Sequence, residues 1–313
     1  MSSTVERAVD RLMAQPPELG LTLAVLAVQG GEVVLERYGP DTTADTTLVS
    51  WSTAKSVTQA LLGIAIRSGY IDADLDGPAP VPEWQDAGDP RRAITVRHLL
   101  TMTSGLRFVE DYVDVGISHC LDMLFGAGQH DVAAYAAELP LDHDPGTVWS
   151  YSSGTTNILA RMIGDAVGGP EAMKAFVHDA LFGPLGMTSA DPRFDDAGTF
   201  VGSSFLWATA RDFARFGQLY LAGGRDLLPA GWVDLARAPV AIVPADEPFG
   251  YGAHWWLWRE FPGVFAAHGY EGQYIVVAPD RDLVFVRLGK TPAELRPNLV
   301  PVLQAIVEGY APR

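Results

Sequence analysis

Segments with strand character lie near both ends of this 313-residue chain, whereas residues 70–205 between them show mostly loop and short helical patterns. Residues 21–29 and 32–38 are rich in Leu, Val and Ala. They are separated by Gly30 and Gly31, whose permissive backbone suits the tight turn of a β-hairpin. Four later segments fit consecutive antiparallel strands: 253–258, 264–267, 273–278 and 283–288. We therefore expect one sheet that is assembled from the two ends of the chain.

Helices are predicted before, between and after these strands. Residues 4–14 carry apolar side chains on one helical face, and residues 292–309 repeat leucine at helical spacing. Another helix begins at Thr53 and ends near Gly69. The predicted fold class is α+β, with an antiparallel sheet flanked by terminal helices and a large, mostly helical insertion. We expect residues 1–68 and 205–313 to form the sheet region and residues 69–204 to form the helical region. The two regions are expected to make one structural unit, with the active site between them.

The charge of the chain limits its partners. Its 38 acidic and 22 basic side chains give a formal net charge of −16, and no basic block occurs. A surface this acidic repels nucleic acid and anionic membranes, and it favours neutral or cationic small molecules. We therefore expect a small-molecule substrate and neither nucleic acid nor membrane as a partner. The sequence does not indicate an oligomeric state.

Targeting and cofactor signals are absent from the sequence. The first twenty residues lack the basic start, apolar run and cleavage site of a signal peptide. Apolar stretches such as residues 60–66 are too short to cross a bilayer, so we expect a cytoplasmic protein. The seven histidines have no metal-ligand spacing, and no glycine-rich nucleotide motif occurs, so neither a metal nor a cofactor is expected. The single cysteine, Cys120, excludes an internal disulfide.

Ser52 and Lys55 form an S-x-x-K motif where a loop meets the helix that begins at Thr53. Residues three apart share a helix face, so the lysine nitrogen is within reach of the hydroxyl. A serine hydroxyl needs a neighbouring base before it becomes a good nucleophile. The free N–H groups of a helix N-terminus also stabilise a developing oxyanion. The motif is short and common, so by itself it is weak support for catalysis.

Two further segments complete a candidate site. Tyr151, followed by Ser152 and Ser153, lies between a turn and a helix, and a nearby lysine cation favours its phenolate. His268 and Gly269 precede Tyr270 between two predicted strands, where glycine lets the backbone approach a ligand closely. Aromatic packing for the tyrosine and a tight strand connection for the glycine are the alternatives.

Together these segments resemble the serine β-lactamase and penicillin-recognising superfamily. The resemblance is closer to its class C-like branch, which includes family VIII esterases and 6-aminohexanoate-dimer hydrolases. That branch has S-x-x-K, then Y-x-N or Y-x-S about a hundred residues later, then a K-T-G or H-x-G-like strand. Further similar segments are 94–106, 184–187, 209–212 and 272–282. The resemblance spans nearly the whole chain and implies a β-lactamase-like fold.

The resemblance also implies roles for individual residues. Ser52 would be the nucleophile, and Lys55 and Tyr151 would transfer its proton. The backbone N–H groups of Ser52 and Tyr270 would form the oxyanion hole. The implied substrate contacts are Tyr112, Ser153, His268 and Gly269. Ser153 replaces the asparagine of Y-x-N, and the K-T-G lysine is absent, so His268 occupies either the lysine position or the next one.

The resulting prediction is a serine hydrolase that cleaves a carboxylic ester or amide through an acyl-enzyme on Ser52. A β-lactamase or D-alanyl-D-alanine carboxypeptidase is the alternative reaction, although the missing lysine and asparagine count against a strong lactamase. A binding protein that kept the fold without catalysis is the remaining alternative. The absence of a G-x-S-x-G motif argues against an α/β-hydrolase.

Overall fold

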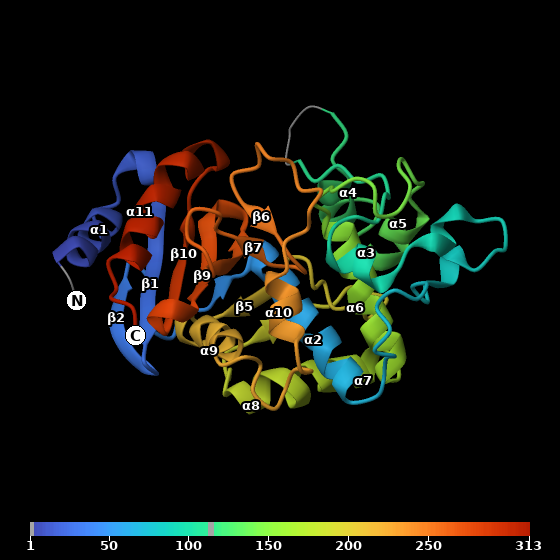
Figure 1. Ribbon diagram of the computed structural model, residues 1–313, viewed down its shortest axis with the longest axis horizontal. Helices are drawn as coiled ribbons and strands as arrows, with labels where there is room; N and C mark the ends of the chain where they lie inside the picture. Colours follow the sequence, from blue (N-terminus) through green and yellow to red (C-terminus); the bar gives the residue numbers. More distant parts are fainter. Residues whose placement is uncertain (1–2, 112–115) are drawn as a thin grey trace.

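A seven-stranded antiparallel sheet runs through the middle of the protein (Figure 1). The structure is a computed structural model, and it describes residues 3–111 and 116–313. The strands, in their order across the sheet, are β2 (Glu32–Tyr38), β1 (Leu21–Gln29), β10 (Leu283–Lys290), β9 (Gln273–Ala278), β8 (Phe265–Gly269), β7 (Trp256–Leu257) and β6 (Gly250–Tyr251). Strand β1 pairs with β10, so that Leu21 faces Lys290 and Gln29 faces Leu283. The predicted joining of the two chain ends in one sheet is therefore confirmed.

Helices cover both faces of the sheet. Helices α1 (Ser3–Met13) and α11 (Arg296–Glu308) pack on one face, whereas α2 (Ala54–Arg67) and α9 (Ala210–Leu221) pack on the other. Side chains alternate between these layers, as the period of a strand requires. Along β1, the side chains of Val25 and Ala27 join the layer of α1 and α11, while those of Ala24 and Leu26 join the layer of α2 and α9. Burial on both faces explains why β1 has so few polar residues.

The helical region lies beside the sheet, on the side of strand β6 and helix α2 (Figure 1). Its helices are α3 (Val96–Leu100), α4 (His119–Phe125), α5 (Val132–Glu138), α6 (Ser153–Val167), α7 (Pro170–Phe176) and α8 (Gly183–Leu185), and α10 (Trp232–Arg237) follows α9. A small second sheet, which the sequence analysis did not predict, consists of β3 (Leu48–Val49), β5 (Leu206–Ala208) and β4 (Asp191–Pro192). Its strands have only two or three residues, too few for a visible alternation. The α+β architecture is as predicted, and the proposed domain boundaries stay a prediction.

One predicted strand was wrong. Residues 253–258 do not form a single strand, because the chain turns between β6 and β7. The Gly252 N–H donates to the Trp255 carbonyl at 2.8 Å, and His254 has a φ of 58°. A left-handed residue breaks the extended backbone, and neither Trp255 nor its apolar neighbours signal this turn in the sequence.

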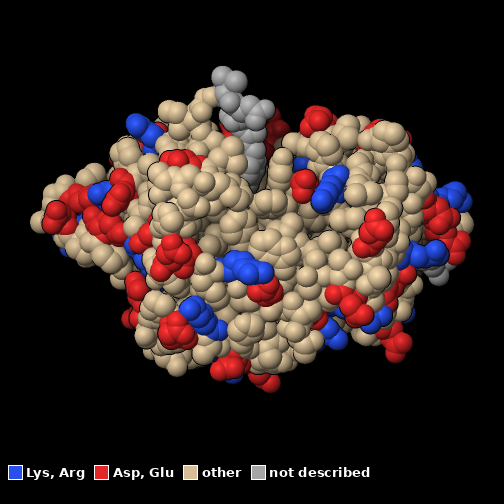
Figure 2. All heavy atoms as spheres, turned by 180° about the vertical axis from the view of Figure 1, so that it is seen from behind, with Lys and Arg blue, Asp and Glu red and all other residues tan. Residues whose placement is uncertain are grey.

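The surface carries the acidic excess of the sequence. On the face in Figure 2, Asp and Glu side chains are widely scattered, and Lys and Arg side chains lie among them without forming a patch. None of the helices in residues 3–111 and 116–313 has the length and hydropathy that a membrane span requires. The cytoplasmic location stays a prediction.

Candidate active site

Ser52 and Lys55 meet at the start of helix α2. Ser52 lies in a short 3₁₀ turn, Trp51–Thr53, that continues directly into the helix. The Lys55 Nζ donates a hydrogen bond to the Ser52 Oγ at 2.9 Å, as expected for residues one helical turn apart. Lys55 is 1% exposed, whereas Ser52 keeps 9%. The hydroxyl is therefore accessible from outside, and the amine behind it is not.

Tyr151 joins this pair from the loop that precedes helix α6. The Lys55 Nζ lies 4.8 Å from the centroid of the Tyr151 ring, and both Lys55 and Ser52 lower the pKa of the phenol against the larger opposing effect of burial. The ring packs against Trp256 and Tyr251, with centroid separations of 5.1 and 5.9 Å. The hydroxyl, the amine and the phenol thus lie in one place, although Tyr151 is far from the other two in the sequence.

Burial and charge set the resting protonation of this cluster. Burial by itself lowers the pKa of Lys55, but the neighbouring Tyr151 and Glu110 outweigh it, so that the pKa is raised above its ordinary value. Burial raises the pKa of Tyr151, and Glu110 adds to this against the opposing effect of the Lys55 cation. At neutral pH the pair therefore rests as an ammonium and a neutral phenol.

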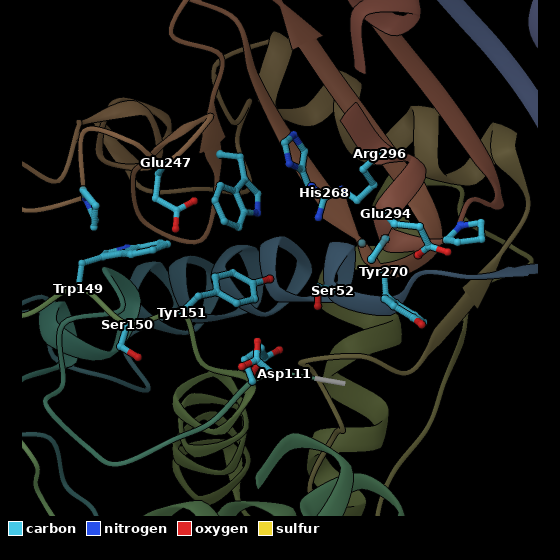
Figure 3. Close-up of a pocket in the computed structure, with 16 residues that line it drawn as sticks. Ser52, Asp111, Trp149, Ser150, Tyr151, Glu247, His268, Tyr270, Glu294 and Arg296 are labelled. Carbon is cyan, nitrogen blue, oxygen red and sulfur yellow. The ribbon is translucent and has the colours of Figure 1, made fainter. Parts of the chain in front are cut away.

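These groups open onto a cavity of about 760 Å³. Figure 3 shows Ser52 at its floor, with Tyr151 and Trp149 on one side and Tyr270 on the other. Among the described residues, the charged ones that line it are Glu110, Asp111, Glu247, Glu294 and Arg296. Four carboxylates and one guanidinium give the cavity a negative potential, which favours neutral or cationic molecules over anions.

The end of strand β8 forms the wall next to Ser52. A Cβ atom at Gly269 would lie 2.4 Å from the Ser50 carbonyl oxygen, so only glycine permits this close approach. Tyr270 begins the turn Tyr270–Gly272, where Glu271 has a φ of 59°, and its ring packs edge-on against Trp51 at 5.7 Å. Ser52 and Tyr270 both line the cavity. Both residues named as oxyanion donors thus lie at the cavity, and their role stays a prediction.

Comparisons with known proteins concern the chain as a whole. The sequence model of a family described as Beta-lactamase matches residues 5–299. The chain belongs to the beta-lactamase family. It is 26% identical to a 6-aminohexanoate-dimer hydrolase of Paenarthrobacter ureafaciens over 91% of this chain and 78% of the relative. It is also 32% identical to the esterase EstB of Burkholderia gladioli, over 44% of this chain and 38% of the esterase.

Solved structures support the same fold. A Bacillus anthracis protein described as a candidate 6-aminohexanoate-dimer hydrolase superposes with a TM-score of 0.77 and 23% identity, over 97% of this chain and 82% of the other. This likeness shows the β-lactamase-like fold that the sequence predicted. With hydrolases among its relatives, the chain is a hydrolase of the β-lactamase-like superfamily.

His268 lies on the cavity wall and packs among aromatic side chains. Side chains alternate along β8, and Ala267 shares the layer of α2, whereas the His268 ring packs with Trp258 and Tyr274 from the opposite layer. The His268 Nε2 accepts a hydrogen bond from the Trp258 Nε1 at 3.0 Å. Burial, with a contribution from Arg296, lowers the pKa of His268 well below its usual range. His268 is therefore a neutral side chain that packs among aromatic rings and also lines the cavity, and both its place in the K-T-G pattern and its contact with substrate stay predictions.

Glu110 is a site residue that the sequence analysis missed. Its Oε1 accepts a hydrogen bond from the Ser153 Oγ at 2.6 Å, and its Oε2 accepts one from the Ser153 N–H at 2.7 Å. The Oε1 atom also lies 3.8 Å from the Lys55 Nζ. A buried lysine needs a counter-ion, but among 38 acidic residues no local pattern singled out Glu110. Tyr112, which was predicted to contact substrate, lies outside the described residues.

Ser153 bridges Glu110 and Lys55. The Lys55 Nζ donates to the Ser153 Oγ at 2.8 Å and to the Ser203 carbonyl at 3.2 Å. The Ser153 hydroxyl therefore receives one hydrogen bond and donates another within the protein. Its predicted contact with substrate stays a prediction, as does that of Gly269 on the cavity wall.

A buried arginine holds the turn that carries Tyr270. Arg287 on β10 is fully buried, and burial lowers its pKa to about 10. Its acceptors are the carbonyl oxygens of Glu271 (3.1 Å), Gly272 (2.8 Å) and Leu21 (3.0 Å) and the hydroxyls of Thr22 (3.0 Å) and Thr291 (2.8 Å). Through the carbonyl groups of Glu271 and Gly272, Arg287 links the turn beside Ser52 to the centre of the sheet.

Replacing Arg287 with methionine is expected to lower the free energy of unfolding by about 3 kcal/mol or more, because buried carbonyl groups lose their donors. Urea unfolding at pH 7 measures this change. Arg259→Met is the matched control, since the exposed Arg259 also donates to two carbonyl groups and surface changes are usually worth less than about 0.5 kcal/mol. Equal losses for the two variants would show that burial of these hydrogen bonds is unimportant.

Proposed function

We propose that this hydrolase cleaves a carboxylic ester or amide by two-step acyl transfer through Ser52. The observation that carries the proposal is the Ser52 hydroxyl, which lies at the floor of an open cavity and is hydrogen-bonded to a buried lysine beside a tyrosine. A serine hydroxyl becomes a nucleophile only where a group can take its proton, and this arrangement supplies such groups.

In the first step the Ser52 Oγ bonds to the substrate carbonyl carbon while its proton passes to the Tyr151 phenolate. The Lys55 cation favours this phenolate over that of an isolated buried tyrosine. The carbonyl oxygen becomes an oxyanion, for which the Ser52 and Tyr270 N–H groups are the proposed donors. Tyr151 then returns the proton to the leaving oxygen or nitrogen as its bond to carbon breaks.

In the second step water takes the place of the leaving group. It gives a proton to Tyr151 as its oxygen bonds to the acyl carbon, and the proton then passes to the Ser52 Oγ as the ester bond breaks. The carboxylic acid leaves and Ser52 is regenerated. No external oxidant, reductant or cofactor enters this balance.

Esters and linear amides fit this cavity better than β-lactams do. Four lining carboxylates repel the carboxylate that β-lactam antibiotics carry. The sequence has no K-T-G lysine to offset that repulsion, and the Ser153 hydroxyl is engaged by Glu110 and Lys55. The relatives named as an esterase and as a 6-aminohexanoate-dimer hydrolase are consistent with these two substrate classes.

A panel of three substrate types tests the proposed class. We expect kcat/KM for p-nitrophenyl butyrate or for the linear dimer of 6-aminohexanoate to exceed that for nitrocefin by at least about 100-fold, equivalent to about 2.7 kcal/mol of transition-state stabilisation. Preferential hydrolysis of nitrocefin would favour the β-lactamase alternative. Binding of all three without turnover of any would favour a non-catalytic protein.

A further inference from the structure

A line of hydrogen bonds connects Ser52 to a carboxylate that the reaction above does not use. The Ser52 Oγ accepts from the Lys55 Nζ at 2.9 Å, the same nitrogen donates to the Ser153 Oγ at 2.8 Å, and that hydroxyl donates to the Glu110 Oε1 at 2.6 Å. Lys55, Ser153 and Ser52 are at most 9% exposed, and the Glu110 side chain is 16% exposed. The line is therefore largely shielded from solvent.

We propose, on the premise that Ser52 is the nucleophile of the proposed function, that Glu110 is a positioning residue that acts through Ser153 to orient Lys55 and to keep it as the ammonium. The Ser153 hydroxyl is the bridge in this arrangement. Glu110 itself touches neither Ser52 nor the reacting carbonyl group.

The backbone of helix α6 fixes Glu110 in this position. Ser153 is the first residue of the helix, and its N–H donates to the Glu110 Oε2 at 2.7 Å. The first N–H groups of a helix have no partner within it, and the helix dipole favours a negative charge there. Both carboxylate oxygens are thus held by one residue. The orientation of the carboxylate is set by a 15-residue helix and not by a flexible side chain.

Glu110 is the carboxylate that faces Lys55 among the described residues. The other titratable groups around the amine are Tyr151, Cys120 and His254, and Tyr251 lies beside Tyr151. Burial lowers the pKa of His254 to about 3 and raises the pKa of Tyr251 well above its usual range, so both are neutral at pH 7. Glu110 is therefore the carboxylate whose charge acts on the pKa of both Lys55 and Tyr151, beside the larger effects of burial and of the two groups on each other.

The negative charge of Glu110 raises the pKa of Lys55 and also that of Tyr151. The proposed reaction requires the deprotonated form of the pair, so activity rises with pH through these pKa values. Glu110 therefore makes the ascending limb of the pH profile more alkaline. Glu110 does not take the proton of Lys55, because an ordinary carboxylate is far too weak a base to remove the proton of an ordinary ammonium. Lys55 therefore stays charged, and its attraction to Glu110 holds it in a fixed place.

The test is the pH profile of kcat/KM for p-nitrophenyl butyrate in Glu110→Gln, which keeps the shape and one acceptor but removes the charge. We expect the ascending limb to move to lower pH by on the order of one unit, and kcat to fall about tenfold with KM nearly unchanged. Ser153→Ala keeps the charge and removes the bridge, so kcat should fall similarly while the limb moves much less.

Two further variants make the outcome decisive. Glu110→Asp keeps the charge but shortens the side chain, so we expect a lower kcat with the ascending limb near its wild-type pH. This variant keeps the proposal testable even if Glu110→Gln folds poorly. Glu308→Gln removes an exposed carboxylate at the end of helix α11, outside the residues that line the cavity, and its limb should stay in place. An unmoved limb in Glu110→Gln, or an equal shift in Glu308→Gln, would overturn the role of Glu110.

The same series includes Ser52→Ala, which separates the two proposals. If Ser52→Ala keeps wild-type activity, the acyl-enzyme on Ser52 fails and the role of Glu110 fails with it. If Ser52→Ala is inactive while Glu110→Gln has a wild-type profile, only the role of Glu110 is lost.

Discussion

Changing Ser52 to alanine is expected to lower kcat/KM for p-nitrophenyl butyrate by at least about 10⁴-fold, because without the Oγ atom no acyl-enzyme forms. The cavity and its backbone donors remain, so a small residual rate above that of water is expected. Initial rates with purified protein, measured at saturating and at low substrate, give kcat and KM separately. The KM should change little, since the hydroxyl contributes mainly to the reaction.

The control for this change is Ser68→Ala, at the opposite and exposed end of the same helix. It should retain wild-type kinetics, and both variants should unfold at similar urea concentrations, because Ser52 is a small residue at the cavity surface. Undiminished hydrolysis by Ser52→Ala would mean that the reaction takes place elsewhere.

Replacing Lys55 with methionine is expected to lower kcat/KM by at least about 10³-fold. The change keeps an unbranched side chain of similar length but removes the cation beside Tyr151 and the donor to Ser52. Less of the Tyr151 phenolate forms, and the Ser52 hydroxyl loses the hydrogen bond that orients it. Proton transfer by such groups typically raises the reaction rate by 10²–10⁴-fold. The same rate assay as for Ser52→Ala measures the loss.

Stability separates this catalytic effect from unfolding. Loss of Lys55 leaves Glu110 without its cation, but the Ser153 N–H and hydroxyl still donate to it, so we expect a loss of less than about 3 kcal/mol in urea unfolding. The double variant Lys55→Met with Glu110→Gln should recover part of that loss, yet recover no activity. Near-wild-type turnover by Lys55→Met would show that the amine takes no part in the reaction.

The large features of the fold were readable from the sequence because they are repeated locally. Strand segments at both chain ends and amphipathic helices at both termini are patterns of apolar residues, and β1, β9, β10, α1 and α2 follow them closely. The turn between β6 and β7 was missed because it depends on the left-handed backbone of His254, a conformation that is uncommon for any residue other than glycine and that one histidine does not predict. The strands of the small sheet β3-β5-β4 are too short to show any period.

The residues of the candidate site also differ in how far the sequence alone revealed them. Ser52 and Lys55 were found by spacing, because one helical turn joins them. Tyr151 is distant in sequence, so its place beside Lys55 followed only from resemblance to a family. Glu110 needed the three-dimensional arrangement, since it lies in a loop and its partners Ser153 and Lys55 lie in two different helices. The packing of His268 against Trp258 and Tyr274 also needed the folded arrangement, because Trp258 lies outside the strand that carries His268.

The acyl-enzyme itself is most directly tested by trapping. A fluorophosphonate bonds to an activated serine oxygen with loss of fluoride. After incubation of the wild-type protein, we expect the intact mass to increase by one phosphonyl group, and digestion should locate that group on Ser52. Ser52→Ala should take up none, and Lys55→Met should react far more slowly. A phosphonyl group found on another residue, or none at all on a protein that hydrolyses esters, would contradict the account.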